Sequence, residues 1–249
     1  MESFDTGWTL DIKNQSWVED TENQVEFIIK TLGLTGKERI LDLACGFGRH
    51  SISLARRGYS VVGVDFTKGY IDDAIMTAKT EDLNVGFILS DFRNLTYDRE
   101  FDVVLSLADG AIGYLDTDEE NLKIFDVISK ALKRGGKHFM DVCNAEHAEL
   151  YFPKRHWDIG SKVLSLPEFD WDKERRRMLY TDWEIKFGEI AKKPDIIESD
   201  TYGIRLYSRA EVEEILGDRD MKILKTFSNY YGKEETPKEM QLMVYSVKE

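Results

Sequence analysis

Cysteine, proline and long apolar runs are scarce in this chain, and each scarcity excludes a class of protein. Only two cysteines, Cys45 and Cys143, occur among 249 residues, far apart and without the spacing of metal ligands, so a disulfide framework or a metal site is not expected. No run approaches the roughly 18 apolar residues of a membrane span, and the N-terminus lacks the basic start and apolar core of a signal peptide. These features predict a cytoplasmic protein with reduced thiols, no membrane association and no bound metal.

An excess of positive charge is also missing. The chain has 34 Lys and Arg against 47 Asp and Glu, which gives a net charge of -13. A protein that binds nucleic acid through its phosphates needs clustered basic residues, so no nucleic-acid partner is expected. The densest basic run, residues 175–177, is flanked by acids and is predicted to be a solvated strand or turn.

Strand and helix signals alternate over the first 143 residues. Thr21 and Gln24 have the spacing of a capping box, which predicts a first helix that ends at Gly33. Apolar runs predict strands at residues 39–43, 59–64, 85–89, 101–107 and 137–142, with helices between them. The last of these helices starts among acids at residues 116–120 and is expected to end at residues 133–136. This alternation predicts a parallel, doubly wound sheet.

The rhythm changes from residue 144 onward. The run LSLPEFDWDKERRRMLYTDWEI places Asp172 and Lys173 between two aromatic-rich arms, which predicts an antiparallel hairpin. Ser208 and Glu211 then form a capping box for a helix that ends near Gly217. Two strands follow, at residues 222–227 and 242–247, and the absence of a helix between them predicts antiparallel pairing.

The predicted fold class is therefore α/β, with a doubly wound and mostly parallel seven-stranded sheet, an antiparallel last strand and a small β-rich insertion. Residues 1–143 and 206–249 are assigned to the main domain, and residues 144–205 to the insertion. Long insertions over a site usually serve it, so the insertion is expected to be a substrate lid.

A glycine turn after the first strand is the first candidate binding feature. In ILDLACGFGRH, Gly46 and Gly48 lack the third glycine of a dinucleotide fingerprint and the Lys-Ser/Thr pair of a phosphate-binding loop. Asp42 is unsuited to a pyrophosphate but suits the ammonium and sulfonium groups of S-adenosylmethionine. Asp65 and Asp91 close the next two strands, where they could meet the ribose diol and the adenine amino group. Three acids at the carboxyl ends of consecutive strands would then face one ligand in the crevice of an open α/β sheet.

Several motifs carry a resemblance to a known family. The segments DLACGFG, VVGVDF, ILSDFRNL, LSLADGAIGYL and ALKRGGKHFMDV resemble successive motifs of class I S-adenosylmethionine-dependent methyltransferases. The likeness covers almost all of the chain and is greatest to the small-molecule branch, with a type 11/25-like domain, whose members often carry CGxGRHS and an RLYS-like segment. One departure is Ala44, which stands where many members have the first glycine.

The resemblance implies a Rossmann-like methyltransferase fold and S-adenosyl-L-methionine as cofactor. It assigns these residues to the cofactor: Asp42, Ala44, Gly46, Gly48, Asp65, Phe66, Asp91, Phe92 and Leu107. The fourth motif lacks the Asn-Pro-Pro-Tyr type of sequence found in enzymes that methylate nucleic-acid bases or glutamine. Together with the negative charge, this favours a small-molecule acceptor.

Candidate catalytic and substrate residues follow from the same motifs. Asp109 and Tyr114 are expected near the transferred methyl group, and His147 is a candidate base. Trp8 and Trp17 are expected to belong to an N-terminal cover over the cofactor. The predicted substrate contacts are Trp157, Tyr202, Arg205 and Tyr207.

The predicted function is methyl transfer from S-adenosylmethionine to an oxygen or nitrogen atom of a small molecule, by in-line displacement. Two alternatives remain at this point: a protein that binds the cofactor without catalysis, and an NAD-dependent oxidoreductase. The sequence favours neither a monomer nor a homodimer.

Overall fold

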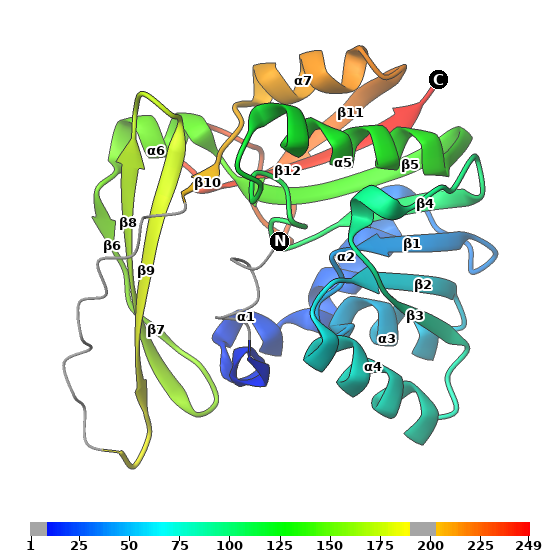
Figure 1. The fold of residues 1–249 in the computed structure, drawn as a ribbon, viewed down its shortest axis with the longest axis horizontal. Coiled ribbons are helices and arrows are strands. Elements are labelled where there is room, and N and C mark those ends of the chain that lie inside the picture. The colour runs from blue at the N-terminus through cyan, green and yellow to red at the C-terminus, as the bar shows by residue number, and fades with distance from the viewer. Residues whose placement is uncertain (1–8, 190–202) are drawn as a thin grey trace.

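A computed structural model of the protein describes residues 9–189 and 203–249, and its centre is a twisted seven-stranded sheet (Figure 1). The strand order is β11-β12-β5-β4-β1-β2-β3, and only β12 runs against its neighbours β5 and β11. The strands are β1 (Arg39–Leu43), β2 (Ser60–Asp65), β3 (Val85–Leu89), β4 (Phe101–Ser106), β5 (Leu132–Cys143), β11 (Met221–Phe227) and β12 (Gln241–Lys248). The predicted fold class, with its reversed last strand, is confirmed.

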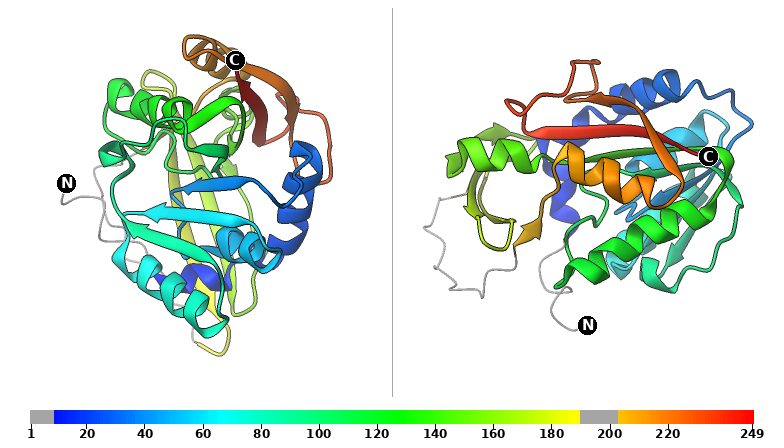
Figure 2. Two further views of the ribbon diagram at one scale, coloured as in Figure 1. Left: turned by 90° about the vertical axis from the view of Figure 1, so that its right-hand side faces the viewer. Right: turned by 90° about the horizontal axis from the view of Figure 1, so that it is seen from above.

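Helices cover both faces of this sheet, as the two views in Figure 2 show. They are α2 (Thr21–Leu32), α3 (Arg49–Arg56), α4 (Lys68–Thr80), α5 (Asp118–Ala131) and α7 (Arg209–Gly217). Successive strand residues point to opposite faces, so Ile40 packs in the core beneath α2 and α3, while Leu41 packs in the core beneath α5 and α7. Because both faces are covered, the inner strands are nearly continuous apolar runs.

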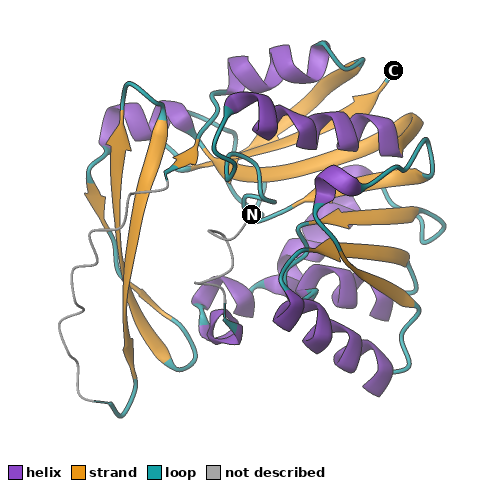
Figure 3. Cartoon of the chain, in the orientation of Figure 1, coloured by secondary structure: helices purple, strands orange, loops and turns teal. Residues whose placement is uncertain are grey.

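A second, five-stranded sheet stands apart from the first (Figure 3). Its order is β10-β9-β8-β6, with β7 also paired to β8. The strands are β6 (Lys154–Arg155), β7 (Asp158–Ile159), β8 (Val163–Asp172), β9 (Arg177–Lys186) and β10 (Ile204–Arg205). The predicted hairpin around Asp172 is present as β8 and β9.

Four short elements complete the described chain: η1 (Leu10–Asn14) and α1 (Ser16–Glu19) near the N-terminus, η2 (Phe92–Asn94) after β3, and α6 (Ala145–Tyr151) after β5. The second sheet lies beyond the carboxyl ends of β1, β2 and β4, with α1 on the same side of the large sheet (Figure 1). Gln15 joins α1 to this sheet, because its Oε1 accepts a hydrogen bond from Ser165 Oγ at 2.8 Å. None of the described helices is long and apolar enough to cross a membrane.

Two local predictions are wrong. Thr21 does not cap α2, because α1 ends just before it and Asp20 occupies the N-cap position; Thr21 Oγ1 donates instead to the Val18 carbonyl at 2.6 Å. Residues 133–136 do not end α5, since β5 already begins at Leu132, whose side chain is buried and pairs with Phe101 of β4. In the first case the preceding helix α1 supplies the partner of the Thr21 hydroxyl. In the second case pairing with β4 extends β5 to the residues that were predicted to end the helix.

The capping box of α7 has the predicted geometry. Ser208 Oγ accepts from the Glu211 backbone N–H at 3.3 Å, and the Glu211 carboxylate accepts from the Ser208 N–H at 2.8 Å. These two bonds satisfy donors that would otherwise be unpaired at the helix start. The helix in turn buries Val212 and Leu216 in the core.

We expect Ser208→Ala to lower the free energy of unfolding by about 1 kcal/mol, because the mutation removes the side-chain acceptor of the cap. Urea unfolding followed by circular dichroism measures the change. Ser161→Ala is the matched control, since Ser161 is exposed and its side chain has no hydrogen bond to any described residue, while its backbone N–H donates to the Asn14 carbonyl. An equal loss in both variants would contradict the assigned role of the cap.

Candidate functional site

A cavity of about 580 Å³ lies at the carboxyl ends of β1 to β4. Trp17 of α1 and the segments that follow β1, β2, β3 and β4 contribute to its wall. All the predicted cofactor residues except Gly48 line it: Asp42, Ala44, Gly46, Asp65, Phe66, Asp91, Phe92 and Leu107. Gly48 packs behind the wall instead, where a Cβ atom would lie 2.7 Å from the Phe87 ring.

The glycine turn between β1 and α3 has an unusual backbone. Ala44, Gly46 and Gly48 all have positive φ values, of 53°, 58° and 76°. Side chains disfavour this left-handed region, so glycine suits two of the three positions. Asp65 stabilises the turn, because its carboxylate accepts from the backbone N–H groups of Gly46 at 2.9 Å and Thr67 at 2.8 Å.

Asp42 is a buried acid at the bottom of the turn. It is only 2% exposed, and one of its carboxylate oxygens accepts a hydrogen bond from Ser51 Oγ at 2.6 Å. Burial raises the pKa of Asp42 to about 6, while the Ser51 bond and the charge of Arg49 limit the rise. A cation that entered the cavity beside Asp42 would favour the ionised form.

Arg49, the first residue of α3, is a site residue whose side chain the sequence analysis missed. Its guanidinium stacks over the Trp17 ring at 4.9 Å and donates to the side chains of Thr21 and Gln24, at 2.9 Å and 2.6 Å. It forms no ion pair with any described residue, and burial lowers its pKa to about 10. A half-buried cation on a cavity wall that has no ion pair among the described residues is suited to an anionic ligand group. The sequence signal that could have identified Arg49 is its position directly after Gly48, at the start of a helix.

Asp91, after β3, has close partners of its own. Its carboxylate accepts from the Arg93 backbone N–H at 2.8 Å and from the Arg93 guanidinium at 2.6 Å. Arg93 also bonds Glu120 at 2.6 Å and so joins two parts of the cavity wall. Although burial opposes it, this hydrogen bonding lowers the pKa of Asp91 below its ordinary value.

The segment after β4 is the most strained part of the cavity wall. Four successive residues, Ala108, Asp109, Gly110 and Ala111, have φ between 51° and 67°. Side chains raise the energy of this conformation, which persists only where its surroundings hold it. Asp109 supplies two such restraints: its N–H donates to the Asp141 carbonyl at 2.8 Å, and its carboxylate accepts from the Cys143 N–H at 3.2 Å.

The predicted pair of Asp109 and Tyr114 is close together. Tyr114 lines the cavity, and its hydroxyl lies 3.4 Å from the Asp109 carboxylate, which stands behind the wall. Burial raises the pKa of Asp109 to about 6. Tyr114 therefore links the cavity surface to the half-buried carboxylate of Asp109.

Asp141, a buried acid next to Asp109, was not predicted. Asp141 of β5 accepts a hydrogen bond from the Tyr230 hydroxyl at 2.8 Å, and Tyr230 belongs to the segment between β11 and β12. Burial raises the pKa of Asp141 to about 7. The two residues are 89 positions apart, so no local pattern could have paired them.

Trp17 lines the cavity as predicted, whereas four other predicted residues do not line it: His147, Trp157, Arg205 and Tyr207. His147 is buried on α6 beside the Tyr151 ring, at 4.7 Å between centroids, and burial lowers its pKa. Trp157 is 63% exposed, Arg205 is paired with acids, and Tyr207 lies in the core against Phe125. Two further predictions, Trp8 and Tyr202, lie outside the described residues.

Comparisons with known proteins agree with this fold. Residues 40–136 match the model of a methyltransferase domain. The chain is 36% identical to a cypemycin N-terminal methyltransferase from Streptomyces over 41% of its length and 40% of the relative. It is 30% identical to a glycine/sarcosine N-methyltransferase from Aphanothece halophytica over 62% and 60%.

A solved S-adenosylmethionine-dependent methyltransferase from Clostridium acetobutylicum superposes with a TM-score of 0.75 and 20% identity, over 92% of both chains. These matches identify a methyltransferase domain at residues 40–136 and confirm the predicted Rossmann-like fold, and they agree with the predicted family and with S-adenosylmethionine as cofactor. The chain spans only about half the length of the curated relatives that it matches.

The buried acids make stability depend on pH. The folded pKa of Asp141, about 7, exceeds its ordinary value of 3.8, so the folded state binds this proton more tightly than the unfolded state. Ionisation then destabilises the fold, increasingly as pH rises above about 4 and fully above about 7. We expect Asp141→Asn to gain about 1–3 kcal/mol relative to wild type at about pH 8 and much less at about pH 5.

Urea unfolding at the two pH values measures this difference. Asp72→Asn is the matched control, because Asp72 is an exposed acid on α4 paired only with Lys68 among the described residues. A pH-independent effect of Asp141→Asn would contradict the raised pKa.

Proposed function

We propose that this protein transfers the methyl group of S-adenosylmethionine to an oxygen or nitrogen atom of a small molecule. The observation that carries the proposal is the cavity at the strand ends, where Asp42, Arg49 and Asp65 surround a left-handed glycine turn. This set of groups matches the zwitterionic methionine end and the ribose of the cofactor.

Each part of the cofactor has a fitting partner in the cavity. Arg49 lacks an ion pair among the described residues and suits the methionine carboxylate, while Asp42 suits the ammonium group. Asp65 would accept from the ribose hydroxyls, and Asp91 with Phe92 would border the adenine. A pyrophosphate would instead meet the buried carboxyl of Asp42, which argues against an NAD-dependent oxidoreductase.

The bound cofactor would supply an electrophilic methyl group, activated by its sulfonium. The chain itself would orient donor and acceptor in a water-poor space, which lowers the barrier by fixing their approach. Tyr114 on the cavity wall is proposed to contact the acceptor, and Asp109 behind it is proposed to act through the Tyr114 hydroxyl, since burial raises the pKa of Asp109 to about 6 and allows it to hold a proton.

The acceptor is proposed to be a small molecule bound between the cavity and the second sheet. The net charge of -13 disfavours a nucleic acid. The relatives named above act, by their names, on the N-terminus of cypemycin and on glycine or sarcosine, and the second of these supports a small acceptor. Residues 144–205 are proposed to cover the acceptor as a lid, because β8 and β9 stand beyond the carboxyl ends of the parallel strands (Figure 1).

Isothermal titration calorimetry with S-adenosylmethionine and S-adenosylhomocysteine tests the cofactor. Folded protein that binds neither ligand would refute the proposal. Production of S-adenosylhomocysteine with panels of small amines, carboxylates, phenols and sugars then tests catalysis. Binding without turnover in every panel would indicate a protein that holds the cofactor without catalysis.

We expect Asp65→Ala to weaken S-adenosylhomocysteine binding about tenfold to a hundredfold. The substitution removes charge-assisted hydrogen bonds to the ribose and the acceptor of the Gly46 N–H. Calorimetry measures the dissociation constant, and Asp72→Ala on exposed α4 is the control that should bind as wild type does. Unchanged affinity of Asp65→Ala would refute the ribose contact.

The affinity for S-adenosylmethionine should fall as the pH drops through about 6. The cationic ligand favours ionised Asp42, whose pKa in the free protein is about 6, so protonation below that pH competes with binding. Asp42→Asn should bind more weakly at neutral pH and lose much of this dependence. A wild-type dissociation constant that is constant from about pH 5 to about pH 8 would contradict the assignment.

A further inference from the structure

We propose that Arg177, on the β8–β9 hairpin, is a positioning residue for the cofactor site. It holds residues 114–116, which line one wall of the cavity, against the second sheet. The inference rests on the proposed function only in that the cavity must bind the cofactor. The sequence predicts a solvated strand or turn at residues 175–177, and the structure has a turn at residues 173–176 and places the half-buried Arg177 at the start of β9.

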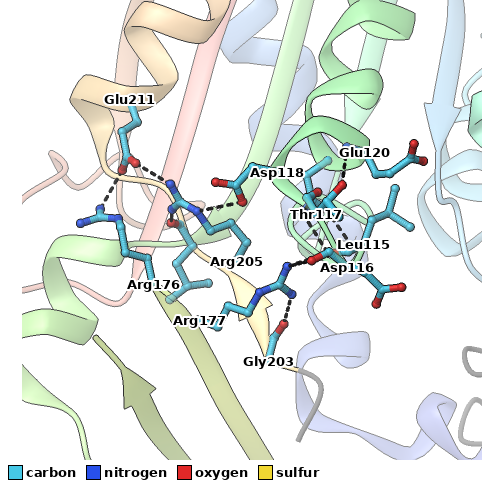
Figure 4. Close-up of polar contacts among 12 residues, drawn as sticks. Leu115, Asp116, Thr117, Asp118, Glu120, Arg176, Arg177, Gly203, Arg205 and Glu211 are labelled. Carbon is cyan, nitrogen blue, oxygen red and sulfur yellow. Dashed lines mark hydrogen bonds and ion pairs between the residues drawn. The ribbon is translucent and has the colours of Figure 1, made fainter. Parts of the chain in front are cut away.

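The guanidinium of Arg177 spans three backbone carbonyls (Figure 4). Nη1 donates to the Gly203 carbonyl at 2.6 Å, beside β10 of the second sheet. Nη2 donates to the carbonyls of Leu115 at 2.8 Å and Asp116 at 2.7 Å. One side chain thereby joins β9, the start of β10 and the segment after β4.

The segment that Arg177 holds belongs to the cofactor cavity. Tyr114, Leu115 and Asp116 all line it, next to Glu120 at the start of α5. Asn121 holds the same segment from the other side, since it accepts from the Leu115 N–H at 2.9 Å and donates to the Leu115 carbonyl at 3.0 Å. The wall is therefore held between α5 and the second sheet, and Arg177 is a contact from the second sheet.

Two glycines make the close approach possible. A Cβ atom on Gly113 would lie 2.0 Å from the Arg205 carbonyl oxygen, and the Gly113 carbonyl accepts from the Arg205 N–H at 2.8 Å. A Cβ atom on Gly203 would lie 2.6 Å from the Arg177 Cβ. Strand β10 thus fits between β9 and the wall only because both positions lack a side chain.

Arg177 differs from its neighbours in what it bonds. Arg176 and Arg205 both pair with Glu211 of α7, at 2.8 Å and 2.7 Å, and so join the second sheet to that helix (Figure 4). Arg177 forms no ion pair with any described residue and donates to carbonyls alone. A planar guanidinium can reach three carbonyls at once, whereas a lysine ammonium is a point donor.

The test measures S-adenosylhomocysteine binding by calorimetry and hydrogen exchange of the Leu115 amide in wild type, Arg177→Gln and Arg177→Lys. We expect Arg177→Gln to bind on the order of tenfold more weakly and its Leu115 amide to exchange faster, since the wall loses its restraint from the second sheet. Arg177→Lys should lie between Arg177→Gln and wild type. Arg175→Gln is the matched control, because Arg175 has a 76% exposed side chain and pairs only with Asp172 among the described residues.

The outcomes separate this inference from the proposed function. If wild type binds no S-adenosylhomocysteine, the proposed function fails. If wild type binds and Arg177→Gln binds equally well with unchanged Leu115 exchange, the positioning role is refuted. A lowered melting temperature with an unchanged dissociation constant would show a merely structural role. Should Arg177→Gln not fold, wild-type values of both readouts in Arg177→Lys would refute the three-carbonyl contact.

Discussion

The hydrogen bond from the Gly46 N–H to the Asp65 carboxylate is the contact on which the cavity depends. Parallel pairing of β1 with β2 brings the ends of both strands to one edge, and Asp65 then restrains the turn after β1 and the start of α4 together. The turn needs this restraint because Ala44, Gly46 and Gly48 have left-handed backbone angles. Without it, the turn that carries the cavity wall at Ala44 and Gly46 would lose this restraint, whereas Asp42 is held separately by strand pairing within β1 and by Ser51.

The cavity wall after β4 also has left-handed backbone angles that hydrogen bonds restrain, although the bonding partners differ. Its left-handed stretch, residues 108–111, is restrained by β5 through the backbone N–H and the carboxylate of Asp109, and the adjoining residues are held by Asn121 and Arg177. Beside this wall, burial raises the pKa of Asp109 to about 6 and the pKa of Asp141 to about 7. Ionised at neutral pH, these two acids lower the free energy of unfolding. A functional site often has such a cost, because its residues are suited to a ligand rather than to stability.

Much of the fold could be predicted because its signals are local. Alternating strand and helix patterns located the parallel strands, and the spacing of Ser208 and Glu211 located the start of α7. The missing helix before β12 predicted its reversed direction. Predictions failed where a neighbouring element competed for the same residues, as at Thr21, where α1 supplies the acceptor, and at Leu132, where pairing with Phe101 extends β5.

The functional site, too, was predicted only where its signals are local. The sequence by itself determined the glycine turn and the acids that close the strands, because strand ends of a parallel sheet must share an edge. Only the tertiary structure decided that Arg49 stacks on Trp17, that Tyr230 bonds Asp141, and that Arg177 reaches Leu115 from 62 residues away. A sequence pattern records which residues become buried or end an element, whereas the partner of a side chain depends on how distant elements pack.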